Sequence, residues 1–195
     1  MINHNLQAIF IHIPKTGGKT IETCLGADVK KLHSRKREIK HGTPLEWKNP
    51  KFWDKYFTFT FARNSWDRLV STYFCELELA PLGAGGSRRK TIAKLGRTGF
   101  KLFVKNHLGK HDKCYLYWQQ MSYLTATYDF IGRFENFQED FDIVCDRIGM
   151  PRKKLPHKNK SKHKHYTEYY DDETREIVAE KYAKDIEYFG YKFGQ

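Results

Sequence analysis

Two lysines, two threonines and two glycines lie close together in residues 14–20, Pro-Lys-Thr-Gly-Gly-Lys-Thr. This segment, which we call the glycine loop, follows the apolar residues 9–13, which predict a buried strand, and immediately precedes a helical pattern. A strand that turns through glycines into a helix directs unpaired backbone N–H groups and the positive end of the helix dipole at one point. Lys15 and Lys19 add full positive charges there, so the sequence predicts a site that binds a phosphate group.

The glycine loop fits only the second half of a Walker A motif, G-x-x-x-x-G-K-[ST], because Ile13 stands where the first glycine belongs. It more closely resembles the P-K-T-G-G-T-S loop of sulfotransferases that use 3′-phosphoadenosine 5′-phosphosulfate (PAPS). Residues 14–18 match that loop, Thr20 stands one residue late, and Lys19 replaces a small hydroxyl residue. The resemblance implies that the 5′-phosphosulfate is bound by six residues of the loop: Lys15, Thr16, Gly17, Gly18, Lys19 and Thr20.

A second segment predicts a strand that leads directly into a helix. Residues 57–62 alternate aromatic with small or hydroxyl side chains, as strands do, and Asn64 or Ser65 can cap the helix that follows. That helix carries one apolar stripe that should pack inward, made of Trp66, Leu69, Val70, Tyr73 and Leu77. Ser71 lies off this stripe, so it and Arg63 at the strand end can converge on one anion.

This segment resembles the R-[ND]-P-x-x-R-x-x-S-x-Y element of the same family, with Ser65 in place of the proline. The resemblance implies that Arg63 and Ser71 hold the 3′-phosphate that distinguishes PAPS from ATP. Residues 128–148 and 159–191 also resemble late segments of the family, the latter those of its carbohydrate-directed branch. The resemblance is weakest over residues 79–113. The resemblance of residues 158–165 to a family loop that folds over the donor implies that one lysine in this segment contacts the donor.

The fold that we expect is α/β, a P-loop-like single domain over residues 1–195 with a central, mostly parallel sheet flanked by helices on both faces. The donor should lie at the carboxyl ends of the strands, where the glycine loop emerges. Two regions, residues 81–90 and 151–165, have the composition of loops.

Two residues are our candidates for catalysis. Lys15 would stabilise the charge that develops on the leaving phosphate, and His41 would accept the proton of the acceptor hydroxyl. His41 lies between the two donor-binding segments, the region from which the resembled enzymes draw their base, and it can alternatively cap a turn. His33 and Glu46 are other candidates, whereas His12 should be structural.

We expect no metal, because Gly109 interrupts the helical spacing of the best candidate ligands, His107, His111 and Cys114. Lysine and arginine number 35 against 23 acidic residues, a net charge of +12 that suits an anionic donor and an acceptor that can itself be anionic.

The predicted function is transfer of a sulfuryl group from PAPS to a hydroxyl group of a carbohydrate, with no specific nucleic-acid partner. A P-loop ATP-dependent kinase and a non-catalytic nucleic-acid or polyanion-binding protein are the alternatives. The sequence has no recognisable signal peptide or membrane span, and its four cysteines lack a C-x-x-C pair. These features predict reduced thiols and a cytoplasmic location.

Overall fold

A computed structural model of the chain describes residues 1–26, 52–82, 86–111, 114–156 and 163–195. The contacts divide the chain into two compact units, each built from two separate stretches. We call Met1–Arg63 with Gln120–Asn159 the sheet unit, and Asn64–Gln119 with Lys160–Gln195 the helical unit. The prediction of one domain is not tested by this division and stays a prediction.

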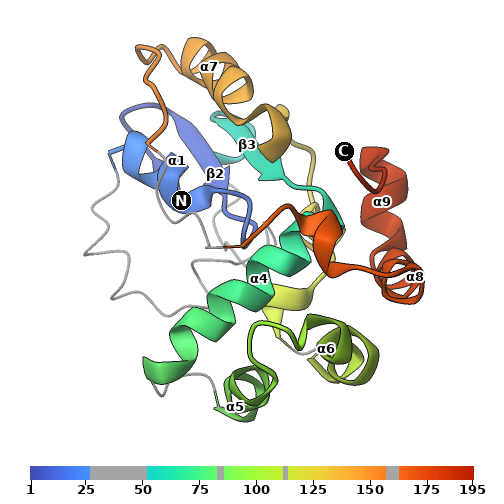
Figure 1. Ribbon diagram of the computed structural model, residues 1–195. Coiled ribbons are helices and arrows are strands. Elements are labelled where there is room, and N and C mark those ends of the chain that lie inside the picture. The colour runs from blue at the N-terminus through green and yellow to red at the C-terminus, as the bar shows by residue number, and fades with distance from the viewer. Residues whose placement is uncertain (27–51, 83–85, 112–113, 157–162) are drawn as a thin grey trace. The chain divides into compact units, whose positions relative to one another are not determined.

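The sheet unit contains a four-stranded sheet in the order β1-β2-β3-β4. Its two central strands, β2 and β3, are labelled in Figure 1. The strands are β1 (Ile2–Asn3), β2 (Ala8–Ile11), β3 (Phe57–Ala62) and β4 (Phe130–Arg133). β2, β3 and β4 are parallel, with Phe10 opposite Phe59 and Phe59 opposite Phe130, while β1 is antiparallel to β2. The carboxyl ends of the three parallel strands therefore meet at one edge of the sheet, and the prediction of a mostly parallel sheet is confirmed.

Two helices of the sheet unit, α1 (Gly18–Cys24) and α7 (Phe137–Arg147), pack against one face of the sheet. The core between them is formed by Ala8, Phe10, Ile21, Leu25, Phe59, Phe61, Phe141, Val144 and Cys145. The threonines of β3 are buried as well, and their hydroxyl groups are hydrogen-bonded inside the unit. Thr60 Oγ1 donates to the carbonyl of Ile11 (2.8 Å), and Thr58 Oγ1 donates to the carboxylate of Asp129 (2.8 Å).

The helical unit contains α4 (Ser65–Leu79), α5 (Gly86–Leu95), α6 (Phe100–His107), α8 (Asp172–Lys181) and α9 (Ala183–Phe189). Asn64 caps α4, since its side-chain oxygen accepts a hydrogen bond from the backbone N–H of Trp66 (3.1 Å). Four members of the predicted apolar stripe are buried, and Leu77 is half-buried. The α4 helix also buries polar residues, among them Arg68, Ser71, Thr72 and Glu76, so it is enclosed on most of its surface.

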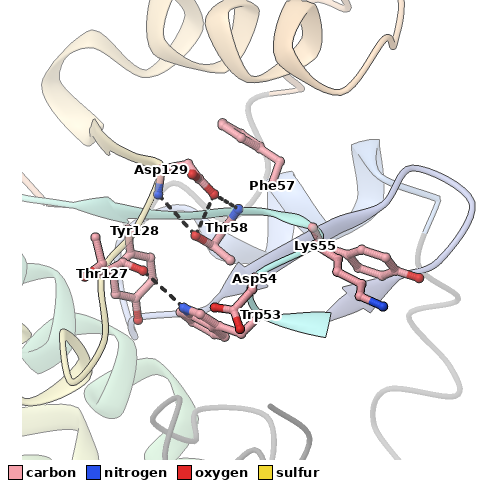
Figure 2. A pocket seen from close by; sticks show the side chains of 9 residues that line it. Trp53, Asp54, Lys55, Phe57, Thr58, Thr127, Tyr128 and Asp129 are labelled. Atoms are coloured by element: carbon pink, nitrogen blue, oxygen red, sulfur yellow. Dashed lines mark hydrogen bonds between the residues drawn. The ribbon is translucent and has the colours of Figure 1, made fainter. Parts of the chain in front are cut away.

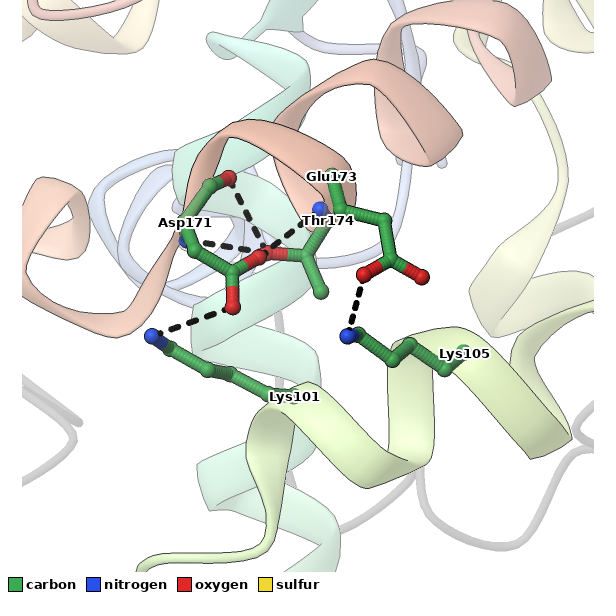
Figure 3. A network of polar contacts seen from close by, with 5 residues as sticks. All are labelled: Lys101, Lys105, Asp171, Glu173 and Thr174. Atoms are coloured by element: carbon green, nitrogen blue, oxygen red, sulfur yellow. Dashed lines mark hydrogen bonds and ion pairs between the residues drawn. The ribbon is translucent and has the colours of Figure 1, made fainter.

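Two surface ion pairs join α6 to the beginning of α8 (Figure 3). Lys101 Nζ lies 3.2 Å from a carboxylate oxygen of Asp171, and Lys105 pairs with Glu173. Asp171 also caps α8, because its carboxylate accepts a hydrogen bond from the backbone N–H of Thr174 (2.9 Å). The Thr174 hydroxyl also donates to this carboxylate. The two hydrogen bonds from Thr174, together with Lys101, hold the pKa of the Asp171 carboxyl well below its usual range.

The expectation of a loop over residues 81–90 is wrong for its second half, because α5 begins at Gly86. Arg88 and Arg89 of this helix both contact the buried carboxylate of Glu76 on α4, at 2.6 Å and 3.2 Å. The glycine and arginine composition that suggested a loop therefore belongs to a helix that is anchored by a tertiary ion-pair network.

Candidate active site

The glycine loop connects the carboxyl end of β2 to the first turn of α1. Thr16 Oγ1 donates to the carbonyl of Ile13 (2.9 Å) and closes the loop from within. Two backbone positions have positive φ, Lys15 at +70° and Gly17 at +83°. The left-handed conformation is ordinary for glycine but unfavourable for lysine, so the surrounding structure must hold Lys15 in place.

Both glycines of the loop are required by close packing. A Cβ atom on Gly17 would lie 2.9 Å from Cε2 of Phe137 and closer still to Cζ. A Cβ atom on Gly18 would lie 2.6 Å from Cγ of His12 and closer still to Cδ2 and Nε2. The backbone of the loop therefore packs against two rings, those of His12, which follows β2, and Phe137, which begins α7.

The side chain of His12 is bound to the helix that follows the loop. Its Nδ1 lies 2.9 Å from Oε1 of Glu22, and the two residues are only 5% and 2% exposed. The imidazole also stacks on Phe10, with ring centroids 5.8 Å apart. The expectation of a structural role for His12 agrees with this buried position.

Arg63 links the two segments that the sequence singled out. It follows β3, and its Nη1 donates a hydrogen bond to the carbonyl of Lys15 (3.1 Å). Its guanidinium carbon lies 4.1 Å from the centroid of the Phe134 ring, so the group is held between the loop and the residue after β4. Gln120 fixes the backbone of Arg63 from both sides, accepting from its N–H (2.9 Å) and donating to its carbonyl (2.8 Å).

The other loop residues differ in accessibility. Thr16 and Thr20 are buried, Lys15 is half-buried and Lys19 is exposed at the start of α1. The structure thus separates the two lysines, since Lys15 lies within the strained loop and Lys19 on a regular helical turn.

Ser71 lies in α4 of the helical unit and is only 3% exposed, so it is not an ordinary surface serine. One turn earlier, the guanidinium of Arg68 donates to the carbonyls of Leu116 (3.4 Å) and Trp118 (2.5 Å). Arg63 belongs to the sheet unit, and its convergence with Ser71 on one phosphate stays a prediction.

Several predicted site residues lie outside the described residues, namely His33, His41, Glu46 and residues 158–162. Two residues that the sequence analysis missed contribute to the site. Phe134 could have been suspected, because it follows the strand of the late resembled segment. Gln120 has no signal in its neighbourhood and is identified only by its two hydrogen bonds to Arg63.

A cavity of about 350 Å³ lies at the opposite edge of the sheet (Figure 2). It is bordered by the amino end of β3 at Phe57 and by Asp129, which precedes β4, and Trp53 and Tyr128 line it. Burial raises the pKa of the Tyr128 hydroxyl, which donates to the carbonyl of Tyr123 (2.7 Å). The whole length of β3 separates this cavity from Arg63, so it is distinct from the predicted donor site.

Within the described ranges, no three histidine, cysteine or acidic side chains come together in a way that could hold a metal ion. The four cysteines, all in described positions, are free thiols, and Cys145 is buried. None of the helices in the described part of the chain combines the length and apolar character that a membrane span requires.

Comparison with known proteins agrees with the motifs. The model of the sulfotransferase family matches residues 1–192. An uncharacterized protein of Archaeoglobus fulgidus is 30% identical over 102 residues, which are 52% of this chain and 74% of that protein. No solved structure matches the chain significantly. With a family match over almost its full length, the chain belongs to the sulfotransferase family.

Proposed function

We propose that this chain transfers a sulfuryl group from PAPS to a hydroxyl group of a carbohydrate. The donor would bind at the carboxyl edge of the parallel strands, with its 5′-phosphosulfate on the glycine loop and its 3′-phosphate at Arg63 and Ser71. Membership of the sulfotransferase family supports sulfuryl transfer in general. The choice of PAPS and of a carbohydrate rests on the resemblance of the two motifs.

One observation carries the proposal for the donor, namely the hydrogen bond from Arg63 to the carbonyl of Lys15. Residues 15 and 63 come from motifs that are far apart in the sequence, and each was assigned to a different phosphate of the same molecule. Their contact supports a single site at one edge of the sheet. An ATP-binding site has no need of a second cationic position for a 3′-phosphate.

The reaction would proceed by attack of the acceptor oxygen on the sulfur atom. The bond between sulfur and the bridging phosphate oxygen breaks, and the bridging oxygen leaves as part of adenosine 3′,5′-bisphosphate. The Lys15 ammonium and the N–H groups of the glycine loop would stabilise the charge on this oxygen, and such donors each contribute about 3 to 4 kcal/mol in the transition state.

The proton of the acceptor hydroxyl would pass to His41, which is our candidate for the general base. A neutral imidazole is suited to this step, because its ordinary pKa lies close to physiological pH. The net charge of +12 favours the approach of the anionic donor, and of an anionic acceptor as well. Chemistry of this kind requires no metal ion, since the cationic side chains neutralise the donor, and a cytoplasmic location remains our expectation.

Isothermal titration of the chain with adenosine 3′,5′-bisphosphate, ATP with Mg²⁺ and a DNA oligomer tests the proposal against its alternatives. We expect the bisphosphate to bind far more tightly than the other two ligands. Preferential binding of Mg²⁺-ATP would favour the kinase alternative, and preferential binding of DNA would favour a non-catalytic polyanion-binding protein. Either result would reject PAPS as the donor.

A further inference from the structure

A buried contact between His12 and Glu22 bridges the two ends of the glycine loop. His12 is the first residue after β2, and Glu22 lies one turn into α1. Their 2.9 Å contact therefore joins the residue before the loop to the helix after it. Neither side chain reaches solvent to any extent, since they are 5% and 2% exposed.

The imidazole of His12 also lies directly against the backbone of the loop. The space that a side chain on Gly18 would need is filled by Cγ, Cδ2 and Nε2 of this ring. Glu22 fixes one edge of the ring and Phe10 stacks on its face, so the ring has little freedom to rotate or withdraw. Any shift of the ring must therefore move Gly18, or leave a gap beneath it.

We infer that His12 is a positioning residue whose ring fixes the backbone position of Gly18 in the glycine loop. Glu22 holds this ring in place through its contact with Nδ1. This inference rests on the proposed function, because it assigns the pair to the part of the site that would hold the 5′-phosphate. Burying two ionisable groups is costly unless they are paired with good geometry. An apolar pair could fill the same volume without this cost, and the pair is therefore explained better by a need for orientation than by stability.

The test compares His12→Ala, Glu22→Ala, Glu22→Gln and the double variant His12→Ala/Glu22→Ala. The matched control is Val144→Ala, which opens a cavity in the hydrophobic core of the sheet unit, a core that contains no residue of the glycine loop. Each protein is titrated with three ligands: adenosine 3′,5′-bisphosphate, ADP and adenosine 3′-monophosphate. The first two have a 5′-phosphate for the loop, and the third does not. Thermal unfolding of each variant is measured in parallel.

We expect His12→Ala and Glu22→Ala to weaken the two ligands with a 5′-phosphate by about tenfold or more, as when a hydrogen bond to a charged group is lost. Binding of adenosine 3′-monophosphate should not change. Glu22→Gln should retain most of the affinity, because its amide can still pair with His12. The double variant should bind no more weakly than the single ones, because the two residues act through the same contact.

The inference is overturned if His12→Ala lowers the affinity for all three ligands to the same extent, which is the effect expected of Val144→Ala if it acts through stability alone. It is also overturned if His12→Ala lowers the affinity for none of them. If His12→Ala does not fold, the test becomes the comparison of the affinities of Glu22→Ala and Glu22→Gln for ADP. Equal affinity of these two variants would overturn the inference. The proposed function fails separately, when unmodified protein binds ADP as tightly as the bisphosphate. In that case the affinity for ADP still measures how well the glycine loop binds a 5′-phosphate, so the inference about His12 can still be tested. If the unmodified protein binds none of the three ligands, both the proposed function and the inference are contradicted.

Discussion

Lys15 has a left-handed backbone, with φ of +70°, at a position where the proposed chemistry requires a lysine. This conformation costs a residue with a Cβ atom about 1 to 2 kcal/mol, whereas glycine adopts it freely. Glycine in turn loses about 0.5 to 1 kcal/mol more backbone entropy on folding than alanine. The difference predicts that Lys15→Gly is more stable than Lys15→Ala by about 1 kcal/mol, or about 2 to 4 °C in Tm for a chain of this size.

Lys19 provides the matched control, because it lies on the first turn of α1. Glycine at a helical position is less stable than alanine, by as much as about 1 kcal/mol. The order of the two variants should therefore reverse, with Lys19→Gly less stable than Lys19→Ala. Differential scanning fluorimetry and urea unfolding of the four proteins measure both differences.

Turnover completes this prediction. Both Lys15 variants should lose sulfuryl transfer, while Lys19→Ala or Lys19→Ser should be affected mildly, so that Lys15→Gly gains stability over Lys15→Ala without recovering activity. If Lys15→Gly were no more stable than Lys15→Ala, the strain argument would be refuted. If Lys19 mattered more for turnover than Lys15, and Mg²⁺ were required, the alignment of the glycine loop would be wrong and the Walker A interpretation would regain support.

Three further predictions concern other residues. His41→Ala should lower kcat about 10² to 10⁴-fold with little change in donor affinity, and the fall in rate at low pH should vanish in this variant; full kcat would remove His41 from the mechanism. Asp171→Ala should lower the free energy of unfolding by about 1 kcal/mol near pH 7, because it removes a helix cap. Since folding lowers the pKa of Asp171, this difference between the two proteins should persist above about pH 4 and shrink at lower pH, as measured by urea unfolding. Glu76→Ala should lower the free energy of unfolding by about 3 kcal/mol or more, since it leaves Arg88 without its buried partner. Asp146→Ala, which breaks an exposed pair with Arg152, should change the free energy of unfolding far less in the same assay.

The strands and helices around the site could be predicted from local patterns. The alternation over residues 57–62 gives β3 with its observed bounds, and Asn64 is one of the two caps that were expected for the next helix. Both features depend on neighbouring residues only. The helix that begins at Gly86 was missed because it is stabilised by a distant partner, Glu76, which local composition does not reveal.

The contacts within the site could not be predicted in the same way. The hydrogen bond from Arg63 to Lys15 depends on the register between β2 and β3, which places the two strand ends side by side. The ring of His12 beneath Gly18 depends on the path of the backbone through the loop. Sequence motifs singled out the two segments that this hydrogen bond joins, but the supporting residues, such as Gln120 and Glu22, emerge only from the packing.

The most direct test of the proposed donor is the ratio of the affinities for adenosine 3′,5′-bisphosphate and ADP, measured by titration calorimetry in unmodified protein and in Arg63→Ala. Loss of the bond from Arg63 to the Lys15 carbonyl should weaken both ligands alike, whereas loss of a contact to the 3′-phosphate weakens only the first. We predict that unmodified protein prefers the bisphosphate by about 10 to 100-fold and that Arg63→Ala removes most of this preference. Equal affinity of the unmodified protein for the two nucleotides would contradict the assignment of PAPS as the donor.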